Sequence, residues 1–297
     1  MSTIVHTEGR FTGRGGLELF RQSWRPPDVS PRATLVNVHG LGDHSSLYPT
    51  LVEHMVGREI VVHAFDLRGN GRSPGPRGHV EDWWDFREDL ARFLDLVRRE
   101  EGGLPLFLAG NSLGGLIVLD YAMLVSEGLR GVAAISAPLG RLGIPSILLA
   151  LGKVLSRAWP RFSLETGMDL SGLARDPAVA EQILADPLFH RRGSARLSTE
   201  VLRTIARVHA GAPAFRVPVL IMHGADDRMV FPDGSRAFAE RVGSPDKQLI
   251  VYPGGYHALF ADAGHERPLA DLSGWLEARL KTLSRLSASV ASVQVWG

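Results

Sequence analysis

Apolar runs alternate with amphipathic stretches along most of this chain. Six stretches, most of them apolar throughout, predict strands: residues 33–39, 60–65, 106–109, 129–136, 218–223 and 247–252. Apolar residues recur at helical spacing between them, most clearly over residues 81–99 and also over residues 47–55, 235–242 and 269–280. Because strands that are apolar on both faces and alternate with helices form a covered, mostly parallel sheet, the pattern predicts an α/β fold. In such a sheet the site forms at the carboxyl ends of the strands.

Both ends of the chain depart from this alternation. Residues 17–24 alternate apolar and polar side chains, which predicts an antiparallel strand at the edge of the sheet, ended by Pro26 and Pro27. From residue 284 onward the sequence has no strong periodicity, and we expect a loosely held tail there.

The alternation is also interrupted between Pro138 and Pro213. Helical segments follow one another in this stretch, including residues 144–159 and 178–184, without a convincing strand between them. An insertion at this point of the chain would lie over the carboxyl ends of the strands. We therefore predict a discontinuous core of residues 1–138 and 213–297, with a helical cap or lid of residues 139–212.

The first predicted cap helix is apolar on most of its surface. Ile144, Leu148 and Leu155 lie among its apolar residues, and Lys153 and Arg157 are among the basic residues that flank them. A helix that is apolar nearly all round is either buried or held against lipid. Two interpretations are therefore open: a cap helix packed on the core, or a lid that touches a membrane or micelle and opens a tunnel for an acyl chain.

Composition narrows the class of protein. The 297 residues are 44% hydrophobic, which is ample for a core, and 33 basic residues against 32 acidic ones give a net charge of +1. This balance argues against a nucleic-acid partner. The absence of cysteine excludes disulfides and thiolate chemistry. No secretory signal and no apolar run long enough to span a membrane is recognisable, so we expect a soluble, cytoplasmic protein whose oligomeric state is open.

One short stretch carries the strongest chemical signal. An apolar run over residues 106–109 ends at Gly110-Asn111-Ser112-Leu113-Gly114, and a helix-like segment follows at once. This G-x-S-x-G pattern between a strand and a helix is typical of a nucleophile elbow, which projects the serine hydroxyl beyond the sheet edge. The following helix also places positive partial charge beside the serine. Ser112 is therefore the candidate nucleophile.

The remaining members of a hydrolytic triad follow in the expected order. In this fold the serine precedes the acid, and the acid precedes the histidine. Asp226 and Asp227 follow the predicted strand of residues 218–223, and His257 follows the strand of residues 247–252. His257 would take the proton of Ser112, and either aspartate could fix its tautomer. The backbone N–H groups of Leu41 and Leu113 are the candidate oxyanion donors.

Five motifs together resemble one branch of a known family. They are residues 39–45 (HGLGDHS), 66–73 (DLRGNGRS), 110–115 (GNSLGG), 224–228 (GADDR) and 256–257 (YH). This set is similar to the monoacylglycerol lipase and lysophospholipase branch of the α/β-hydrolases. The resemblance implies an α/β-hydrolase fold, a serine hydrolase activity and, from the spacing after Gly224, Asp227 as the acid. We further expect Asp43, Ile144 and Leu148 to contact the substrate.

The chain departs from this resemblance at a few positions. The residue before the nucleophile is Asn111, where the branch usually has histidine. Leu47 and Phe260 align with an arginine and a histidine that the resemblance links to the glycerol pocket of animal monoacylglycerol lipases. This puts two polar substrate contacts in doubt.

Other polar residues are assigned structural roles. We expect His39 to bond backbone near the oxyanion loop, and His63 and His223 to be core histidines. No metal-ligand spacing is present, and the nucleotide-binding motifs fail: residues 69–74 lack a third glycine, and Ile147 stands where a P-loop needs its first glycine. We predict no metal and no cofactor.

Three functions fit the sequence to different degrees. The favoured one is hydrolysis, through an acyl-enzyme, of carboxylic esters of single-chain lipids, either monoacylglycerols or lysophospholipids. The alternatives are a short-chain carboxylesterase whose cap is only structural, and a non-catalytic lipid-binding protein on the same scaffold. The sequence leaves the head group, the acyl length and the choice between hydrolysis and acyl transfer open.

Overall fold

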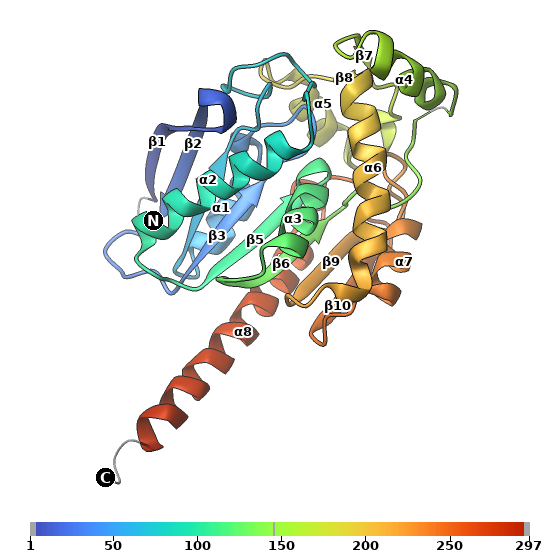
Figure 1. Cartoon of the computed structure of the whole chain (residues 1–297). Coiled ribbons are helices and arrows are strands. Elements are labelled where there is room, and N and C mark those ends of the chain that lie inside the picture. Colours follow the sequence, from blue (N-terminus) through green and yellow to red (C-terminus); the bar gives the residue numbers. More distant parts are fainter. Residues whose placement is uncertain (1–3, 145, 294–297) are drawn as a thin grey trace.

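The protein is organised around one twisted sheet. The computed structural model describes residues 4–144 and 146–293, and the side chains at 146, 148, 149 and 283–293 lie outside that description. The eight strands of the sheet stand in the order β1-β2-β4-β3-β5-β6-β9-β10 (Figure 1). They are β1 (Val5–Thr12), β2 (Glu18–Arg25), β3 (Ala33–Val38), β4 (Ile60–Phe65), β5 (Leu106–Asn111), β6 (Leu129–Ile135), β9 (Val219–Gly224) and β10 (Lys247–Tyr252). The strands from β4 to β10 are parallel, which confirms the mostly parallel α/β fold.

Helices cover both faces of this sheet. The helices of the core are α1 (Pro49–Val56), α2 (Trp84–Glu101), α3 (Leu113–Leu124), α7 (Asp233–Arg241) and α8 (Glu266–Val293). One apolar cluster joins the sheet to α2, α3 and α7, and a second joins its other face to α1 and α8. The strands between these clusters are buried on both sides, which explains why most of them are apolar throughout their length.

One prediction about the ends of the chain is wrong. The strand expected at residues 17–24 is antiparallel as predicted, but it is not an edge strand, because β2 pairs with β4 on one side and β1 on the other. The edge strand β1 exposes most of its residues, so its sequence lacks the apolar alternation that marks a strand. At the other end, the chain is helical as far as Val293, and this part of α8 runs away from the body (Figure 1), so the loosely held tail stays a prediction.

The segment between β6 and β9 is mainly helical. It contains α4 (Ser146–Ala158), α5 (Pro177–Ala185) and α6 (Ala195–Gly211), with a small antiparallel pair of β7 (Ser163–Glu165) and β8 (Arg192–Ser194) that the sequence did not predict. In Figure 1 the first two helices lie beyond the upper end of the sheet, and α6 descends beside α3. The lower part of α6 therefore packs on the core, and the division into a cap of residues 139–212 and a core stays a prediction.

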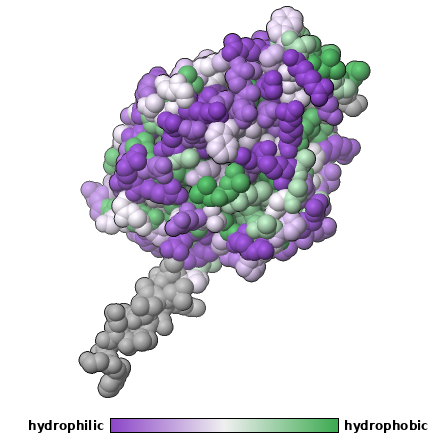
Figure 2. Space-filling model, in the orientation of Figure 1, coloured by the Kyte–Doolittle hydropathy of each residue, from purple (hydrophilic) through white to green (hydrophobic). Residues whose placement is uncertain are grey.

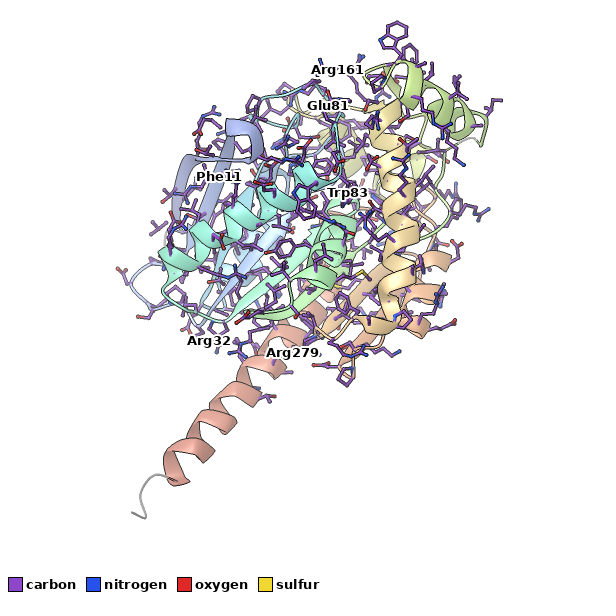
Figure 3. The ribbon with its side chains drawn as sticks, viewed as in Figure 1. Phe11, Arg32, Glu81, Trp83, Arg161 and Arg279 are labelled. Atoms are coloured by element: carbon purple, nitrogen blue, oxygen red, sulfur yellow. The ribbon has the colours of Figure 1, made fainter. Side chains whose placement is uncertain are left out.

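An ion pair fastens this cap segment to the loop before α2. Arg161 follows α4, and its guanidinium donates to the Glu81 carboxylate, with its Nη2 atom 2.6 Å from Oε1. The two side chains meet at the top of the molecule, where the cap approaches the α2 side of the core (Figure 3). Both side chains are more than half exposed, so this ion pair adds little to the free energy of unfolding. Its main effect is to orient the cap segment against the loop before α2.

Candidate active site

Ser112 stands at a strained turn between β5 and α3. Its backbone angles of φ 51° and ψ −120° lie outside the regions that a serine normally adopts, as a nucleophile elbow requires. The crowding of the turn explains its glycines. A Cβ atom at Gly110 would lie 2.3 Å from the Gly114 carbonyl oxygen, and one at Gly114 would lie 2.1 Å from the Val38 oxygen. The spacing of glycines around Ser112 is therefore a steric requirement of the turn.

The loops after β9 and β10 bring an acid to a histidine. His257 Nδ1 lies 2.6 Å from Asp227 Oδ2. The other carboxylate oxygen of Asp227 accepts hydrogen bonds from the backbone N–H groups of Met229 and Val230, both at 2.9 Å. Asp227 is buried, whereas the neighbouring Asp226 is exposed. Of the two aspartates that the sequence left open, Asp227 is the one placed against His257.

This pair is poised electrostatically. Burial alone would raise the pKa of Asp227, but the charge of His257 and the hydrogen bonds from His223 and His257 outweigh it and lower that pKa. Burial likewise opposes the His257 cation, yet the charge and hydrogen bond of Asp227, helped by Asp43, raise the pKa of His257. The environment therefore favours an ionised Asp227 and stabilises an imidazolium at His257, as a general base needs during attack.

His223 contributes a contact that the sequence did not predict. It is buried on β9 as expected of a core histidine, but its Nε2 atom lies 3.3 Å from Asp227 Oδ2 and 2.9 Å from the Val230 carbonyl oxygen. Its Nδ1 atom lies 2.8 Å from Ser235 Oγ. Because Nε2 faces two acceptors, it carries the proton. His223 therefore points a donor toward the Asp227 carboxylate and helps to hold it in place. The spacing of four residues between His223 and Asp227 was the only available signal.

Leu41 and Leu113, the two residues predicted to supply the oxyanion hole, border one cavity together with Ser112. Leu113 is the first residue of α3, and Leu41 lies in the loop after β3. His39 is buried beneath that loop: the backbone N–H of Leu67 donates to its Nε2 atom at 2.9 Å, and its Nδ1 atom lies 2.7 Å from the Gly40 oxygen. The prediction that His39 bonds backbone near the oxyanion loop is confirmed.

A mainly apolar cavity leads from Ser112 into the cap. This cap cavity, of about 140 Å³, is bordered by residues of α4, α6 and the β7–β8 pair, together with the loops after β6 and β9. Its apolar lining residues include Leu142, Ile144, Leu151, Leu155, Phe162, Leu164, Leu197 and Val201. Ile144 thus borders the cavity as predicted for a substrate contact. The side chain of Leu148, for which the same contact is predicted, lies outside the described residues.

A second cavity meets the first at Ser112. This loop cavity, of about 80 Å³, also borders His257 and shares Leu41 and Thr166 with the cap cavity. Its polar lining includes Asp43, Tyr48 and Asn111, and its apolar lining includes Leu47, Leu173, Ile183, Phe189 and Phe260. The two residues that depart from the resemblance, Leu47 and Phe260, therefore face the same cavity as the candidate triad.

The polar groups of the loop cavity are partly engaged within the protein. Tyr48 donates its hydroxyl hydrogen to Asp43 Oδ2 at 2.8 Å, and the Asn111 amide donates to Asn37 at 2.9 Å. The Tyr48 hydroxyl contacts one oxygen of the Asp43 carboxylate, and a carboxylate can accept several hydrogen bonds. Asp43 can therefore receive a hydroxyl of a bound alcohol. Within the described residues, no group of three or more histidine or acidic side chains is arranged to hold a metal ion.

Comparison with known families decides which family of hydrolases this is. Residues 29–264 match the profile of the Hydrolase_4 family, described as serine aminopeptidase, S33. The chain belongs to the Hydrolase_4 family. The match covers β3 through the loop that carries His257, and so includes every candidate catalytic residue.

Several proteins that are similar to this chain are monoacylglycerol lipases. The monoacylglycerol lipase of Mycolicibacterium smegmatis is 31% identical over 286 residues, which cover 94% of this chain and 100% of that protein. Human monoglyceride lipase is 32% identical over 260 residues, covering 86% of this chain and 82% of the human protein. The resemblance to the monoacylglycerol lipase branch is thereby confirmed.

Solved structures of monoacylglycerol lipases share the fold over nearly the whole chain. The crystal structure of Paleococcus ferrophilus monoacylglycerol lipase aligns with a TM-score of 0.80 and 36% identity, over 88% of this chain and 99% of that one. A soluble variant of Saccharomyces cerevisiae monoglyceride lipase, solved with a substrate analog, aligns with a TM-score of 0.85 and 26% identity, over 93% and 96%. The α/β-hydrolase fold is confirmed.

Proposed function

We propose that this carboxylic ester hydrolase cleaves esters of single acyl chains, monoacylglycerols above all, through an acyl-enzyme on Ser112. The observation that carries the proposal is the apolar cap cavity, which opens onto Ser112 beside the Asp227–His257 pair. The lipase relatives support the same class of substrate. The family description names a peptidase, so family membership alone does not choose the bond that is cleaved.

The geometry supports a two-step mechanism. His257 takes the proton of the Ser112 hydroxyl as its oxygen attacks the ester carbonyl, and Asp227 holds the ring in the required tautomer. The carbonyl oxygen becomes an oxyanion, which the N–H groups of Leu41 and Leu113 stabilise. When the tetrahedral intermediate collapses, His257 returns the proton to the leaving alcohol. Water then repeats the sequence on the acyl-enzyme and releases the fatty acid.

The two cavities give each part of the substrate a place. The acyl chain occupies the cap cavity, where its methylene groups lose contact with water, and the alcohol occupies the loop cavity beside His257. Asp43 accepts a hydroxyl of the alcohol. Because Leu47 and Phe260 leave much of that cavity apolar, binding energy comes mainly from the acyl chain.

Acyl length is therefore expected to control the rate. Across glycerol monoesters from butyrate to oleate, kcat/KM should rise by up to about fourfold per methylene, from about 0.8 kcal/mol per buried group, until the cavity is filled. Leu155→Trp, which narrows the cap cavity, should move the maximum to shorter chains and spare butyrate. The measurement is the initial rate of each ester, with Ser112→Ala as the blank.

Lys153→Trp is the matched control for the narrowing variant. Lys153 is a nearby residue of α4, but it is exposed and does not border the cap cavity, so the same indole there leaves the cavity open. A rate maximum at acetate or butyrate in the unaltered protein would contradict the lipid substrate and favour the short-chain carboxylesterase. Loss of chain selectivity in both tryptophan variants would show that the cap cavity does not hold the chain.

A second part of the proposal concerns the outer face of α4. The face of α4 that packs on α6 is small and polar, with Ser156 Oγ 2.7 Å from Thr199 Oγ1 of α6. Its outer face carries apolar side chains, with Ile147 74% exposed and Val154 66% exposed, and Trp159 just beyond the helix is 62% exposed. Figure 2 shows a hydrophobic surface at this end of the cap. This arrangement supports transient contact of the cap with a lipid surface.

Charge on this face is expected to weaken that contact. The double variant Ile147→Asp/Val154→Asp should lower the rate on monoacylglycerol in vesicles by about tenfold, because two apolar anchors are lost. The rate on a water-soluble ester should change less than twofold. Sedimentation with vesicles and parallel rate measurements check both expectations. Leu124→Asp, at an exposed apolar position of the core, is the control.

An equal loss on the soluble ester would place the effect within the site and contradict a role of this face in lipid contact.

Within the described residues, no helix is both long enough and apolar enough to cross a membrane. A cytoplasmic location stays our prediction, and fractionation of cells that express the protein tests it.

A further inference from the structure

The oxyanion loop, residues 39–43, is held at three successive peptide groups. The first group joins Gly40 to Leu41, and its carbonyl oxygen lies 2.7 Å from His39 Nδ1. The Leu67 N–H donates to the other ring nitrogen of His39, so Nδ1 carries the proton and donates to the Gly40 oxygen. Because the C=O and N–H of a trans peptide point in opposite directions, fixing this oxygen also fixes the direction of the Leu41 N–H.

The second peptide group is held by Asn70. The backbone N–H of Gly42 donates to Asn70 Oδ1 at 3.1 Å, and the Asn70 amide donates to the Arg68 oxygen at 3.0 Å. Asn70 is itself buried in the loop after β4. The amide therefore has a fixed orientation, with its oxygen turned toward the oxyanion loop.

The third peptide group is held by the cap. The backbone N–H of His190, which follows α5, donates to the Gly42 oxygen at 3.1 Å. The two chains pass so closely that a Cβ atom at Gly42 would lie 1.9 Å from the His190 oxygen, and Gly42 has a φ of +83°. Only glycine fits at this contact for both reasons.

The ring of His190 completes the arrangement. Its Nδ1 atom accepts the Arg192 N–H at 3.2 Å, so the proton is on Nε2. That Nε2–H faces Asn70 Oδ1 at 2.9 Å and the Gly69 oxygen at 3.2 Å. Asn70 Oδ1 thus accepts from the cap and from the oxyanion loop at once. Burial and the charge of Arg77 lower the pKa of His190 to about 4, so the ring is neutral at pH 7.

The geometry points to His190 and Asn70 as positioning residues that link the docked cap to the oxyanion hole. This inference rests on the proposed function, because it assigns the Leu41 N–H to the oxyanion. Neither side chain touches the reacting atoms. They act by fixing the peptide groups that follow Leu41, so that its N–H is held in place before the oxyanion forms.

The inference makes the cap part of the catalytic machinery. Withdrawing residue 190 would remove the donor to the Gly42 oxygen and one of the two donors that Asn70 Oδ1 accepts. The loop would then lose one fixed point directly, and the Asn70 amide that provides another would be held less firmly, so the Leu41 N–H would be less well preorganised. A cap that only encloses the acyl chain would leave these groups unchanged.

Two substitutions at residue 190 separate this role from packing. In His190→Gln the side-chain amide can place an N–H donor where Nε2 stands. The shorter side chain of His190→Asn reaches only the position of Nδ1, so it loses the donor to Asn70. We expect His190→Asn to lower kcat by about 10- to 100-fold, less than the 10²- to 10³-fold cost of removing an oxyanion donor, with KM within twofold. His190→Gln should stay within about threefold of the unaltered protein in kcat.

A second measurement, the affinity for an inhibitor that forms an oxyanion, tests the oxyanion hole directly. A long-chain alkyl trifluoromethyl ketone adds to the serine and presents an oxyanion to the hole, whereas the matching fatty alcohol does not. The affinity of His190→Asn for the ketone should fall by the same factor as kcat/KM, and its affinity for the alcohol should be unchanged. Asn70→Ala should behave in the same way. The double variant should be little worse than Asn70→Ala, because both changes act on one loop.

His79→Ala is the matched control. His79 also joins the core to the cap, with Nδ1 2.9 Å from Ser194 Oγ, but it does not contact the oxyanion loop. Its loss should lower the melting temperature without a selective loss of ketone affinity. Equal kcat in His190→Asn and His190→Gln, or equal ketone losses in His79→Ala and His190→Asn, would overturn the inference. Undiminished activity of Ser112→Ala would instead overturn the proposed function.

Discussion

Ser112→Ala is expected to lower kcat for a long-chain monoacylglycerol by about four to six orders of magnitude, because it removes the atom that carries the acyl group. His257→Ala should cost a similar factor. The double variant should be little slower than either single one. The nucleophile and its base act as a unit, so losing either one already removes most of the catalysis. The measurement is kcat of the purified variants, with the unfolding midpoint checked for each.

Covalent labelling provides the control for this prediction. A fluorophosphonate should label the unaltered protein at Ser112 and should fail to label Ser112→Ala. Losses that add up in the double variant would contradict a triad in which the two residues act together. Labelling at another serine would move the nucleophile elsewhere.

The second large effect is expected at the acid. Asp227→Asn should lower kcat by about four orders of magnitude. Asp227 Oδ1 accepts the N–H groups of Met229 and Val230, so the asparagine must keep its oxygen at that position. Its NH₂ group then faces His257 Nδ1 and donates to it. The ring is left with its proton on Nε2, toward Ser112, where it cannot accept the serine hydrogen.

Asp226→Asn is the matched control, because it makes the same chemical change one residue away at an exposed position. We expect less than a threefold change in kcat there. Parallel pH profiles are the decisive measurement: only Asp227→Asn should recover activity at high pH, where hydroxide takes over part of the base's role. The reverse ranking of the two variants would assign the acid to Asp226.

The strand pattern predicted the candidate triad because topology does most of the assembly. Ser112, Asp227 and His257 each follow a parallel strand, and the carboxyl ends of those strands meet at one edge of the sheet. The apolar runs were recognisable because these strands are buried on both faces. The choice between Asp226 and Asp227 needed the resemblance. The conformation of the loop decides which of the two is buried, and neither composition nor periodicity predicts that conformation.

What the sequence could not predict depends on contacts between distant residues. The bond between His190 and Asn70 spans 120 positions, and neither residue stands in a periodic pattern. The paired strands β7 and β8 are each only three residues long, which is too short to give a strand signal. For α4, apolar composition alone could not separate the half that borders the cap cavity from the half that faces outward.

The junction of two cavities at Ser112 also sets an order of events. In the binding mode proposed above, the alcohol lies in the loop cavity beside His257, so it would depart first, while the fatty acyl group would remain covalently held in the cap cavity. The vacated compartment is then the space next to the general base, and whatever enters it becomes the attacking nucleophile. Water entering there gives hydrolysis. A second alcohol of the same shape gives an exchanged ester, so the balance between the two products follows the relative occupancy of one small compartment.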